Sequence, residues 1–349
     1  MKKRVLITGS NGVLGKNLVR YLKNNYDDFF ELVLFDLAHD QDFFTQFETF
    51  TGDLRDPNIL KQAVEEVEIV IHAASASPSY PDTEVYDIII NGSKNLFEVT
   101  FNHEKVSRLI YLSSTSVYGV PQKTPLYETD AVMPYDPYNK SKMAVEELCS
   151  TWRKKGKCVT ILRPRSFIGP GRLGTFAILY EWASEGHHFP MIGSGKNLYQ
   201  LLDVEDLCQA IYLAMVGERE QVNDLFNIGA AEFASIKEDY QAVLEAAGFY
   251  KKIISLPAKP MFLILNILEK LKLSPFYKRL YLKLNKDYYV SIDKAKAKLG
   301  YAPRYSNQAA LLRNYYWYLQ EKERLGKANG AGNNATWNQG ILRLGKLFF

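Results

Sequence analysis

Short apolar runs alternate with segments of helical periodicity over the first half of the chain. The runs cover residues 5–8, 32–35, 47–51, 69–71, 109–112 and 159–162. Runs of this length favour strands, whereas the apolar spacing of residues 13–21, 57–66 and 83–104 favours helices. Strands and helices in alternation are typical of a parallel sheet that is covered on both faces. Right-handed crossovers then predict a doubly wound α/β fold, with ligands bound at the carboxyl edge of the sheet.

A glycine-rich turn follows the first predicted strand and opens the first predicted helix. Its sequence is Gly9-Ser10-Asn11-Gly12-Val13-Leu14-Gly15. Glycine allows a tight turn and a close backbone approach to a pyrophosphate, and the amino end of a helix offers free N–H groups. The spacing is G-x-x-G-x-x-G and differs from the general G-x-G-x-x-G fingerprint. Its place between a strand and a helix nevertheless predicts a dinucleotide site in a Rossmann-type sheet.

An aspartate, Asp36, ends the second predicted strand, about twenty residues after the last glycine of the turn. A carboxylate at this place accepts hydrogen bonds from the adenosine ribose hydroxyls and repels a 2′-phosphate. Asp36 therefore favours NAD over NADP. The competing interpretation is a solvated loop aspartate without a ligand.

Tyr138 and Lys142 lie four residues apart in a predicted helix that begins at Asp136 and Pro137. Four residues is about one helical turn, so both side chains leave the same face. A nearby ammonium favours the phenolate, and lowering a tyrosine pKa from roughly 10 to about 7 takes about 4 kcal/mol. The pair is a candidate acid–base device, although helical surfaces also carry this spacing by chance.

The order of these features resembles the extended short-chain dehydrogenase/reductase superfamily, and within it the NAD-dependent epimerase/dehydratase family, over roughly residues 3–320. The stretches that carry the resemblance are Thr8 to Gly15, Gly52-Asp53-Leu54, His72-Ala73-Ala74-Ser75, Asn91, Ser113 to Gly119, Tyr138 with Lys142, Arg163-Pro164, Gly169-Pro170-Gly171 and Gly300-Tyr301-Ala302-Pro303.

The resemblance implies a role for each of these residues. Tyr138 would exchange a proton with a substrate hydroxyl, Lys142 would lower the Tyr138 pKa and hold the nicotinamide ribose, and Ser114 would hydrogen-bond the substrate oxygen. NAD would carry the hydride. The residues implied to bind NAD are Gly9, Asn11, Gly12, Val13, Leu14, Gly15, Asp36, Asp53, Leu54, Ala73, Ala74, Ser75, Asn91, Ser113, Tyr138, Lys142 and Pro164.

We expect residues 1–170 to form the NAD-binding domain, with segments near 198–230 returning to it. Residues 171–197 and 231–322 would form a smaller C-terminal substrate-binding domain. The tail 323–349, rich in glycine, asparagine and alanine over its first half, is expected to be flexible. The segment 260–289 is dense in leucine, phenylalanine and tyrosine and predicts core or pocket lining. An apolar substrate or a membrane-surface contact is the alternative for that segment.

Three functions fit the resemblance. In a sugar-nucleotide epimerase, NAD oxidises a ring hydroxyl and the hydride returns to the other face of the ketone. The alternative is an oxidoreductase similar to 3β-hydroxysteroid dehydrogenases, which acts on a bulky alcohol or ketone. A non-catalytic dinucleotide sensor of the same fold is disfavoured, because the set Ser114, Tyr138 and Lys142 is complete.

Some positions depart from the pattern of sugar-nucleotide epimerases. Ser166 stands where an asparagine is frequent, and Tyr199 stands where an arginine holds a diphosphate. Three cations, Lys196, Arg165 and Arg172, are candidates to replace that arginine. The 4,6-dehydratase branch carries an Asp-Glu pair after its catalytic hydroxyl, and this chain has Thr115-Ser116 there. The sugar-nucleotide epimerase remains the leading hypothesis, ahead of the oxidoreductase similar to 3β-hydroxysteroid dehydrogenases.

The composition limits the classes of partner that the protein is expected to bind. The 349 residues carry a net charge of +4 without a dense Lys/Arg block, which disfavours nucleic acid. The three cysteines are scattered and indicate buried thiols in a reducing compartment, and the five histidines lack metal-ligand spacing. The apolar runs are too short for a signal-peptide core or a transmembrane segment, so we expect a cytoplasmic protein. The resemblance implies a homodimer with a small-molecule substrate.

Overall fold

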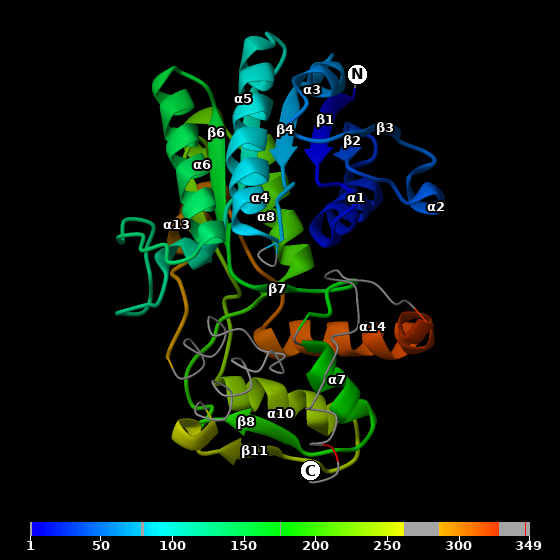
Figure 1. Ribbon diagram of the computed structural model, residues 1–349, viewed down its shortest axis with the longest axis vertical. Coiled ribbons are helices and arrows are strands. Elements are labelled where there is room, and N and C mark those ends of the chain that lie inside the picture. Colours follow the sequence, from blue (N-terminus) through cyan, green and yellow to red (C-terminus); the bar gives the residue numbers. More distant parts are fainter. Residues whose placement is uncertain (1, 78–79, 175, 262–285, 328–345, 347–349) are drawn as a thin grey trace.

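The protein consists of a seven-stranded sheet flanked by helices and a smaller lobe below it (Figure 1), as seen in a computed structural model. The structure describes residues 2–77, 80–174, 176–261, 286–327 and 346. The arrows of β1 and β4 point toward the smaller lobe, so the carboxyl edge of the sheet faces it. The edge at which a doubly wound sheet binds ligands therefore lies between the two parts.

The central sheet is parallel throughout and has the strand order β10-β6-β5-β4-β1-β2-β3. Its strands are β1 (Lys3–Thr8), β2 (Phe30–Asp36), β3 (Glu48–Thr51), β4 (Ile69–His72), β5 (Arg108–Leu112), β6 (Val159–Pro164) and β10 (Leu225–Ile228). Each apolar run noted above overlaps one of these strands. The runs in β1, β2, β4, β5 and β6 are buried, whereas β3, which begins at Glu48, is largely exposed. The predicted Rossmann-type α/β fold is confirmed.

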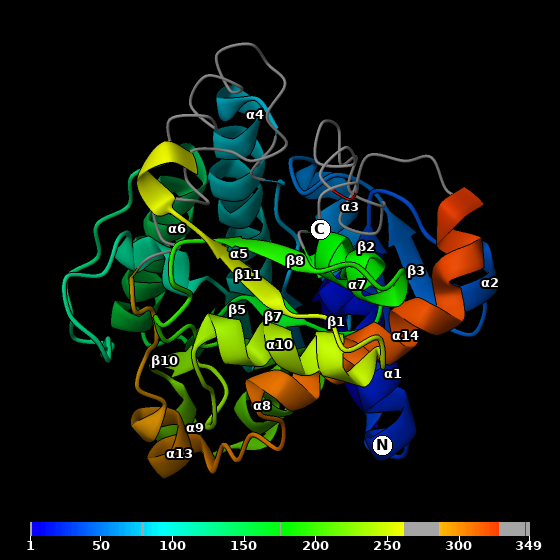
Figure 2. The ribbon, with the colours of Figure 1, turned by 90° about the horizontal axis from the view of Figure 1, so that it is seen from below.

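Helices cover both faces of this sheet (Figure 2). They are α1 (Val13–Tyr26), α2 (Gln41–Phe44), α3 (Pro57–Val64), α4 (Asp82–Tyr86), α5 (Gly92–Asn102), α6 (Pro137–Lys154), α8 (Val204–Val216), α9 (Arg219–Val222) and α13 (Asp293–Leu299). Residues of α1 and α8 share one apolar core, and residues of α3, α5 and α6 share a second. The single helix predicted at 83–104 is three segments, because a π-helical stretch (η1, Asp87–Asn91) separates α4 from α5.

The smaller lobe has its own apolar core. It contains α7 (Phe176–Ser184), α10 (Ile236–Ala246), α14 (Asn307–Lys327) and the two-stranded pair β8 (Phe189–Ile192) and β11 (Ile253–Leu256). A further short pair, β7 (Phe167–Ile168) and β9 (Leu202–Asp203), links this lobe to the sheet. A capping box between Ser235 and Glu238 begins α10.

The structure also bears on the expected tail. Helix α14 continues to Lys327, so residues 323–327 are helical. Lys346 pairs with Glu181 at 2.5 Å and with Glu185 at 2.7 Å on α7. The rest of the tail and most of the apolar segment 260–289 lie outside the described residues. In the parts that the structure describes, no helix is long and apolar enough to cross a bilayer.

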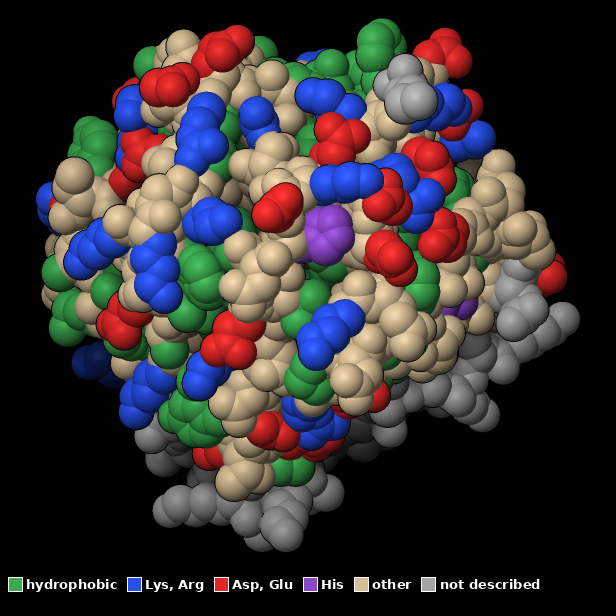
Figure 3. Space-filling view, turned by 90° about the horizontal axis from the view of Figure 1, so that it is seen from above, with side chains coloured by type: hydrophobic (Ala, Val, Ile, Leu, Met, Phe, Trp, Pro, Cys, Tyr) green, Lys and Arg blue, Asp and Glu red, His purple; other side chains and the backbone are tan. Residues whose placement is uncertain are grey.

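Acidic and basic side chains are interspersed on the face at the amino edge of the sheet (Figure 3). Arg4 pairs there with Glu31 at 2.6 Å and with Glu48 at 2.7 Å, and Lys105 pairs with Glu66. Because acidic and basic side chains alternate around these pairs, this part of the surface carries charges of both signs.

Candidate active site

The glycine turn joins β1 to α1 at the carboxyl edge of the sheet. Gly9 has a φ of +74°, and a Cβ there would lie 2.6 Å from the backbone N of Ala74. A Cβ at Gly15 would lie 2.2 Å from the carbonyl O of Gly9. The fold itself therefore requires glycine at these two positions. Among the described residues, a Cβ at Gly12 would meet only the Gly9 O, at 3.2 Å, so the middle glycine borders open space.

The amino end of α1 fits a dinucleotide pyrophosphate. Gly12 is the N-cap residue, and no side chain of the described residues caps the helix. The first amides of α1, including those of Val13 and Leu14, are therefore free donors at the positive end of the helix dipole. Within the described residues, the buried Oδ1 of Asn11 also has no hydrogen-bond partner. Open space, free amides and an unpaired amide oxygen together suit NAD.

Asp36 is fixed beside this turn. Its Oδ2 accepts a hydrogen bond from the Asn11 N at 2.8 Å, and its Oδ1 accepts one from the Leu37 N at 2.7 Å. Both bonds come from backbone amides, so the carboxylate is held at the end of β2 while lone pairs remain for a ligand. This placement suits the expected contact with the adenosine ribose.

The turn after β4 connects the glycine turn to the candidate catalytic tyrosine. Thr8 accepts hydrogen bonds from the Ala73 N at 3.2 Å on its carbonyl O and from the Ala74 N at 3.3 Å on its Oγ1. Ser75 follows, and its hydroxyl hydrogen-bonds the Tyr138 hydroxyl. The three residues expected to lie along the cofactor therefore run from one half of the site to the other.

Asp53 and Asn91 belong to a separate surface network. Arg55 donates from Nη2 to Asp53 at 2.6 Å and from Nη1 to Asp87 at 2.9 Å. The Asn91 Nδ2 donates to the other oxygen of Asp87 at 2.7 Å. Leu54 is buried beside this network. The structure thus places the exposed Asn91 with Asp53 and does not bring it to the candidate catalytic residues.

Tyr138 and Lys142 lie on the first turns of α6, which Asp136 caps as expected. Lys142 is buried, and its Nζ donates to the carbonyl O of Leu112 at 2.9 Å. The same Nζ lies 5.8 Å from the centroid of the Tyr138 ring and 5.0 Å from that of the Tyr111 ring. The ammonium is therefore held between the end of β5 and two aromatic faces.

Ser114 lies two residues beyond Leu112, at the same strand end. It is the N-cap of a short 3₁₀ helix (η2, Thr115–Tyr118), and its Oγ accepts hydrogen bonds from the Ser116 N at 3.1 Å and the Ser116 Oγ at 2.8 Å. Among the described residues, no hydrogen bond joins the Tyr138 hydroxyl to Ser114 or to Lys142. The end of β5 thus gathers the three groups without linking them directly.

The pKa directions at this site differ in one respect from the expectation. Burial raises the pKa of Tyr138, while the charge of Arg172 and the hydrogen bond with Ser75 lower it. Burial lowers the pKa of Lys142 to about 8, and the charge of Glu146 opposes that shift. Arg172 is therefore a cation acting on Tyr138 that was not expected in this role. The expected effect of Lys142, whose ammonium bonds the Leu112 carbonyl and lies over the phenol ring, stays a prediction.

Arg172 is held on a fixed loop between the two parts of the protein. Its guanidinium lies 4.3 Å from the centroid of the Phe167 ring, and its carbonyl O accepts a hydrogen bond from the Asn314 Nδ2 at 2.9 Å. The Asn17 Nδ2 of α1 donates to the neighbouring Pro170 O at 2.9 Å. No carboxylate among the described residues pairs with this guanidinium. Sequence reasoning considered Arg172 only as a ligand for a diphosphate.

A buried clamp fixes the helix that carries Tyr138 and Lys142. Glu146, one turn after Lys142, accepts hydrogen bonds from the Arg163 Nε at 2.9 Å and the Arg163 Nη2 at 2.5 Å. The hydroxyl of Ser113, which was expected to contact the cofactor, donates to the same carboxylate. Sequence reasoning missed Glu146, although its place four residues after Lys142 puts it on the same helical face.

Arg165 is buried and structural. It donates to the Gln200 O at 3.0 Å, to the Tyr288 O at 2.9 Å and to the Thr115 Oγ1 at 3.3 Å. The Thr115 hydroxyl in turn donates to the Pro164 O at 3.2 Å, at the end of β6. Each guanidinium nitrogen of Arg165 already bonds the protein and the side chain is buried, so this residue is a poor substitute for the missing diphosphate ligand.

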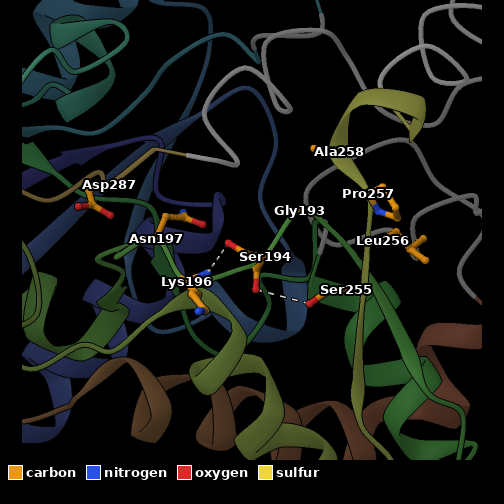
Figure 4. A pocket seen from close by; sticks show the side chains of 9 residues that line it. All are labelled: Gly193, Ser194, Lys196, Asn197, Ser255, Leu256, Pro257, Ala258 and Asp287. Atoms are coloured by element: carbon orange, nitrogen blue, oxygen red, sulfur yellow. Dashed lines mark hydrogen bonds between the residues drawn. The ribbon is translucent and has the colours of Figure 1, made fainter.

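Lys196 is exposed at a pocket in the smaller lobe (Figure 4). The pocket has a volume of about 710 Å³ and is lined by Gly193, Ser194, Lys196, Asn197, Ser255, Leu256, Pro257, Ala258 and Asp287. This volume is typical of small-molecule sites. Asp287 accepts a hydrogen bond from the Leu198 N at 2.8 Å, whereas the exposed Lys196 ammonium pairs with no carboxylate of the described residues. In the part of the chain that the structure describes, no group of His, Cys, Asp and Glu suits a metal ion.

Comparisons with known proteins agree with this geometry. A family model described as the NAD dependent epimerase/dehydratase family matches residues 5–229. An uncharacterized protein of Sinorhizobium fredii, y4nG, is 31% identical over 345 residues, which cover 98% of this chain and 85% of that protein. A UDP-glucose 4-epimerase of Lactobacillus helveticus is 26% identical over 273 residues, covering 70% of this chain and 82% of that protein. A 3 beta-hydroxysteroid dehydrogenase/Delta 5→4-isomerase of Mycobacterium tuberculosis is 27% identical over 359 residues, covering 92% of each.

Among solved structures, the UDP-glucose 4-epimerase of Thermotoga maritima with UDP-glucose has a TM-score of 0.75 at 22% identity. The superposition covers 91% of this chain and 99% of that chain, and it supports the fold. The matched family residues run from β1 to the end of β10 and include the glycine turn and all three candidate catalytic residues. The chain therefore belongs to the NAD dependent epimerase/dehydratase family, and it is an NAD-dependent enzyme.

Proposed function

We propose that this protein is a sugar-nucleotide epimerase in which Ser114, Tyr138 and Lys142 are the catalytic residues. The observation that carries the proposal is the arrangement at the end of β5. Lys142 bonds the carbonyl of Leu112 at 2.9 Å, Ser114 follows on the same strand end, and the Tyr138 ring lies 5.8 Å from the Lys142 ammonium. These groups share the carboxyl edge of the sheet with the open amino end of α1.

Each residue has a distinct part in the proposed reaction. NAD, when bound, accepts a hydride from the substrate carbon and returns it. The Tyr138 oxygen takes the proton of the substrate hydroxyl when the ketone forms and gives it back when the alcohol forms again. Ser114 donates a hydrogen bond to the substrate oxygen in both directions. Lys142 orients the nicotinamide ribose and keeps a positive charge beneath the phenol.

We propose that the pocket around Lys196 receives the part of the substrate that does not react. A sugar nucleotide carries a diphosphate, for which Lys196 is the candidate partner in place of the arginine that Tyr199 replaces. Backbone and hydroxyl groups of Ser194, Asn197 and Ser255 line the same pocket, together with the apolar Leu256. One lysine is a weaker diphosphate clamp than a bidentate arginine, so we expect modest substrate affinity.

A steroid-dehydrogenase-like oxidoreductase is the second candidate. The Mycobacterium tuberculosis relative aligns with 92% of this chain, whereas the Lactobacillus helveticus epimerase aligns with 70%. The absence of an arginine at Tyr199 also suits a substrate without a diphosphate. The two functions share the proposed proton transfer at Tyr138 and differ in whether the hydride returns to the substrate.

One experiment separates them. The purified protein is denatured and the released NAD is measured, and the native enzyme is then assayed with UDP-glucose and with a 3β-hydroxysteroid, each with and without added NAD. An epimerase interconverts the UDP-sugar without net NADH. Continuous NADH formation from the steroid, without turnover of the sugar nucleotide, would contradict the first proposal and support the second.

The proposed domain division, assembly and location also follow from the family. We propose that residues 1–170 and 198–230 bind NAD and that the remaining described residues up to 322 bind substrate. The addition of β10 to the edge of the sheet beside β6 supports the return of the second segment. A cytoplasmic homodimer is proposed as the working assembly, and light scattering of the purified protein tests its mass.

A further inference from the structure

Asp40, four residues after Asp36, forms an ion pair with Lys16 in the first turns of α1. Lys16 follows Gly15 in α1, and its Nζ lies 3.0 Å from the Oδ2 of Asp40. The ammonium also lies 5.8 Å from the Phe43 ring centroid and 5.9 Å from that of Phe44. These contacts direct the side chain toward α2, away from the open space of the glycine turn.

His39 lies between the glycine turn and the end of β3. The His39 Nε2 lies 3.3 Å from the Ser10 Oγ, and its Nδ1 lies 3.1 Å from the Thr51 Oγ1. Burial lowers the pKa of His39, and the charge of Asp36 opposes that shift. The imidazole is therefore neutral at neutral pH. Among the basic side chains that the described contacts place here, the His39 imidazole is neutral and Lys16 is paired with Asp40, while the Arg20 guanidinium lies 4.7 Å from the Phe43 ring centroid.

The Lys16–Asp40 pair contributes little to stability. The two side chains are 21% and 41% exposed, and exposed ion pairs are worth about 0–1 kcal/mol. A basic side chain near the ribose is, however, what accommodates the 2′-phosphate in enzymes that use NADP. Pairing with Asp40 holds the Lys16 ammonium away from the place beside Asp36 where a 2′-phosphate would bind.

We propose that Asp40 is a cofactor-specificity residue, because it holds Lys16 against α2 and so denies a 2′-phosphate its cationic partner. NADP is then rejected twice, by the negative charge of Asp36 and by the withdrawal of Lys16. This inference rests on the proposed place of the adenosine ribose at Asp36. It concerns binding and not turnover, so it can fail while the proposed reaction stands.

The test is a calorimetric titration of the full-length protein with NAD and with NADP. Asp40→Asn should tighten NADP binding by up to about fivefold, since Lys16 no longer has to leave an exposed ion pair to reach the phosphate, and should change NAD binding less than about twofold. Asp42→Asn is the matched control: it removes the same charge from the same helix at an exposed position. Adding Lys16→Gln to Asp40→Asn should cancel the gain.

Each other outcome overturns the inference. If Asp40→Asn leaves the ratio of NADP to NAD affinity unchanged, the proposed role of Asp40 is wrong. The proposed NAD site would still stand, because NAD binding would persist. An equal gain in Asp42→Asn would show that only the overall charge matters. A gain that survives Lys16→Gln would exclude Lys16. A wild-type protein that binds neither dinucleotide, or that prefers NADP, would also contradict the proposed position of the adenosine ribose at Asp36.

Discussion

Glu146 and Arg163 form a two-pronged ion pair beneath the candidate catalytic helix, with 2.9 Å from Nε and 2.5 Å from Nη2 to the carboxylate. Both side chains are buried, and Ser113 adds a third hydrogen bond. The pair joins α6 to β6 and to the end of β5. Because Tyr138 and Lys142 lie on α6 and Ser114 lies beyond β5, this contact fixes the register of all three.

Glu146→Gln should therefore destabilise the protein. The substitution leaves the guanidinium of Arg163 buried without a charge partner, which costs about 3–5 kcal/mol. Chemical denaturation measures the change in the free energy of unfolding. Glu147→Gln, at the exposed neighbouring position, should change it by less than about 0.5 kcal/mol. Equal effects of the two substitutions would show that the buried pair is not the cause.

Tyr138→Phe should lose most of the activity and keep the cofactor. Positioned acid–base catalysis is typically worth about 10²–10⁴-fold, and phenylalanine preserves the ring that packs beside Lys142. Steady-state kinetics and NAD titration measure the two effects separately. Tyr127→Phe, at an exposed tyrosine, is the control and should be neutral. Retention of full activity in Tyr138→Phe would remove this residue from the mechanism.

The pH profile should report the charge of Arg172. Because that charge lowers the Tyr138 pKa, Arg172→Gln raises the pKa, and the phenolate forms only at higher pH. The acid limb of the rate of substrate oxidation should move upward by about one pH unit. Arg172→Lys keeps the charge and should restore most of the original profile. A uniform fall in rate without movement of that limb would point to a purely structural role.

Lys142→Met should stabilise the folded enzyme at pH 7 while it abolishes activity. Burial lowers the pKa of Lys142 to about 8, so the protonated amine costs on the order of 3 kcal/mol below that pH. Loss of the bond to Leu112 offsets about 1 kcal/mol of the gain. In the wild type, stability rises between about pH 8 and the ordinary lysine pKa near 10.5, since the unfolded chain then binds more protons. The advantage of the variant, measured by denaturation, should therefore shrink from pH 7 to pH 9.5.

Two glycines of the turn, Gly9 and Gly12, should separate folding from binding. Gly9→Ala forces a Cβ to 2.6 Å from the Ala74 backbone at a φ of +74°, so it should unfold or strongly destabilise the protein. Gly12→Ala brings a Cβ to 3.2 Å from the Gly9 O at an ordinary φ of −69°, a tight contact that needs only a small shift, so the variant should fold with NAD affinity reduced at least about tenfold. Thermal unfolding and NAD titration distinguish the two. Normal NAD binding by Gly12→Ala would place the pyrophosphate elsewhere.

Local patterns predicted the fold and much of the candidate site. The glycine turn and the pair Tyr138 and Lys142 were found because each depends on a short segment whose strand or helix fixes its geometry. The choice of Ser114 followed from the family resemblance of the segment after the fifth strand, in which this serine stands four residues before Tyr118. All of these features are set by neighbours in the sequence.

The features that escaped prediction depend on packing between distant segments. Whether Arg165 binds a ligand is decided by the carbonyls of Gln200 and Tyr288, and nothing near Arg165 in the sequence indicates them. The approach of Arg172 to Tyr138 depends on a loop tied to α1 and α14 in the same way. A family pattern names the residue type at a position but leaves the partner of its side chain open.

The buried guanidinium of Arg165 ties the end of β6 to two distant chain segments through the carbonyls of Gln200 and Tyr288, and it also contacts Thr115 after β5. Moving either segment away would break a hydrogen bond in a dry environment. We therefore expect these segments to keep their positions around Arg165 during turnover. Variation in substrate range is then expected in loops that do not contact this guanidinium, because they can change without breaking its hydrogen bonds.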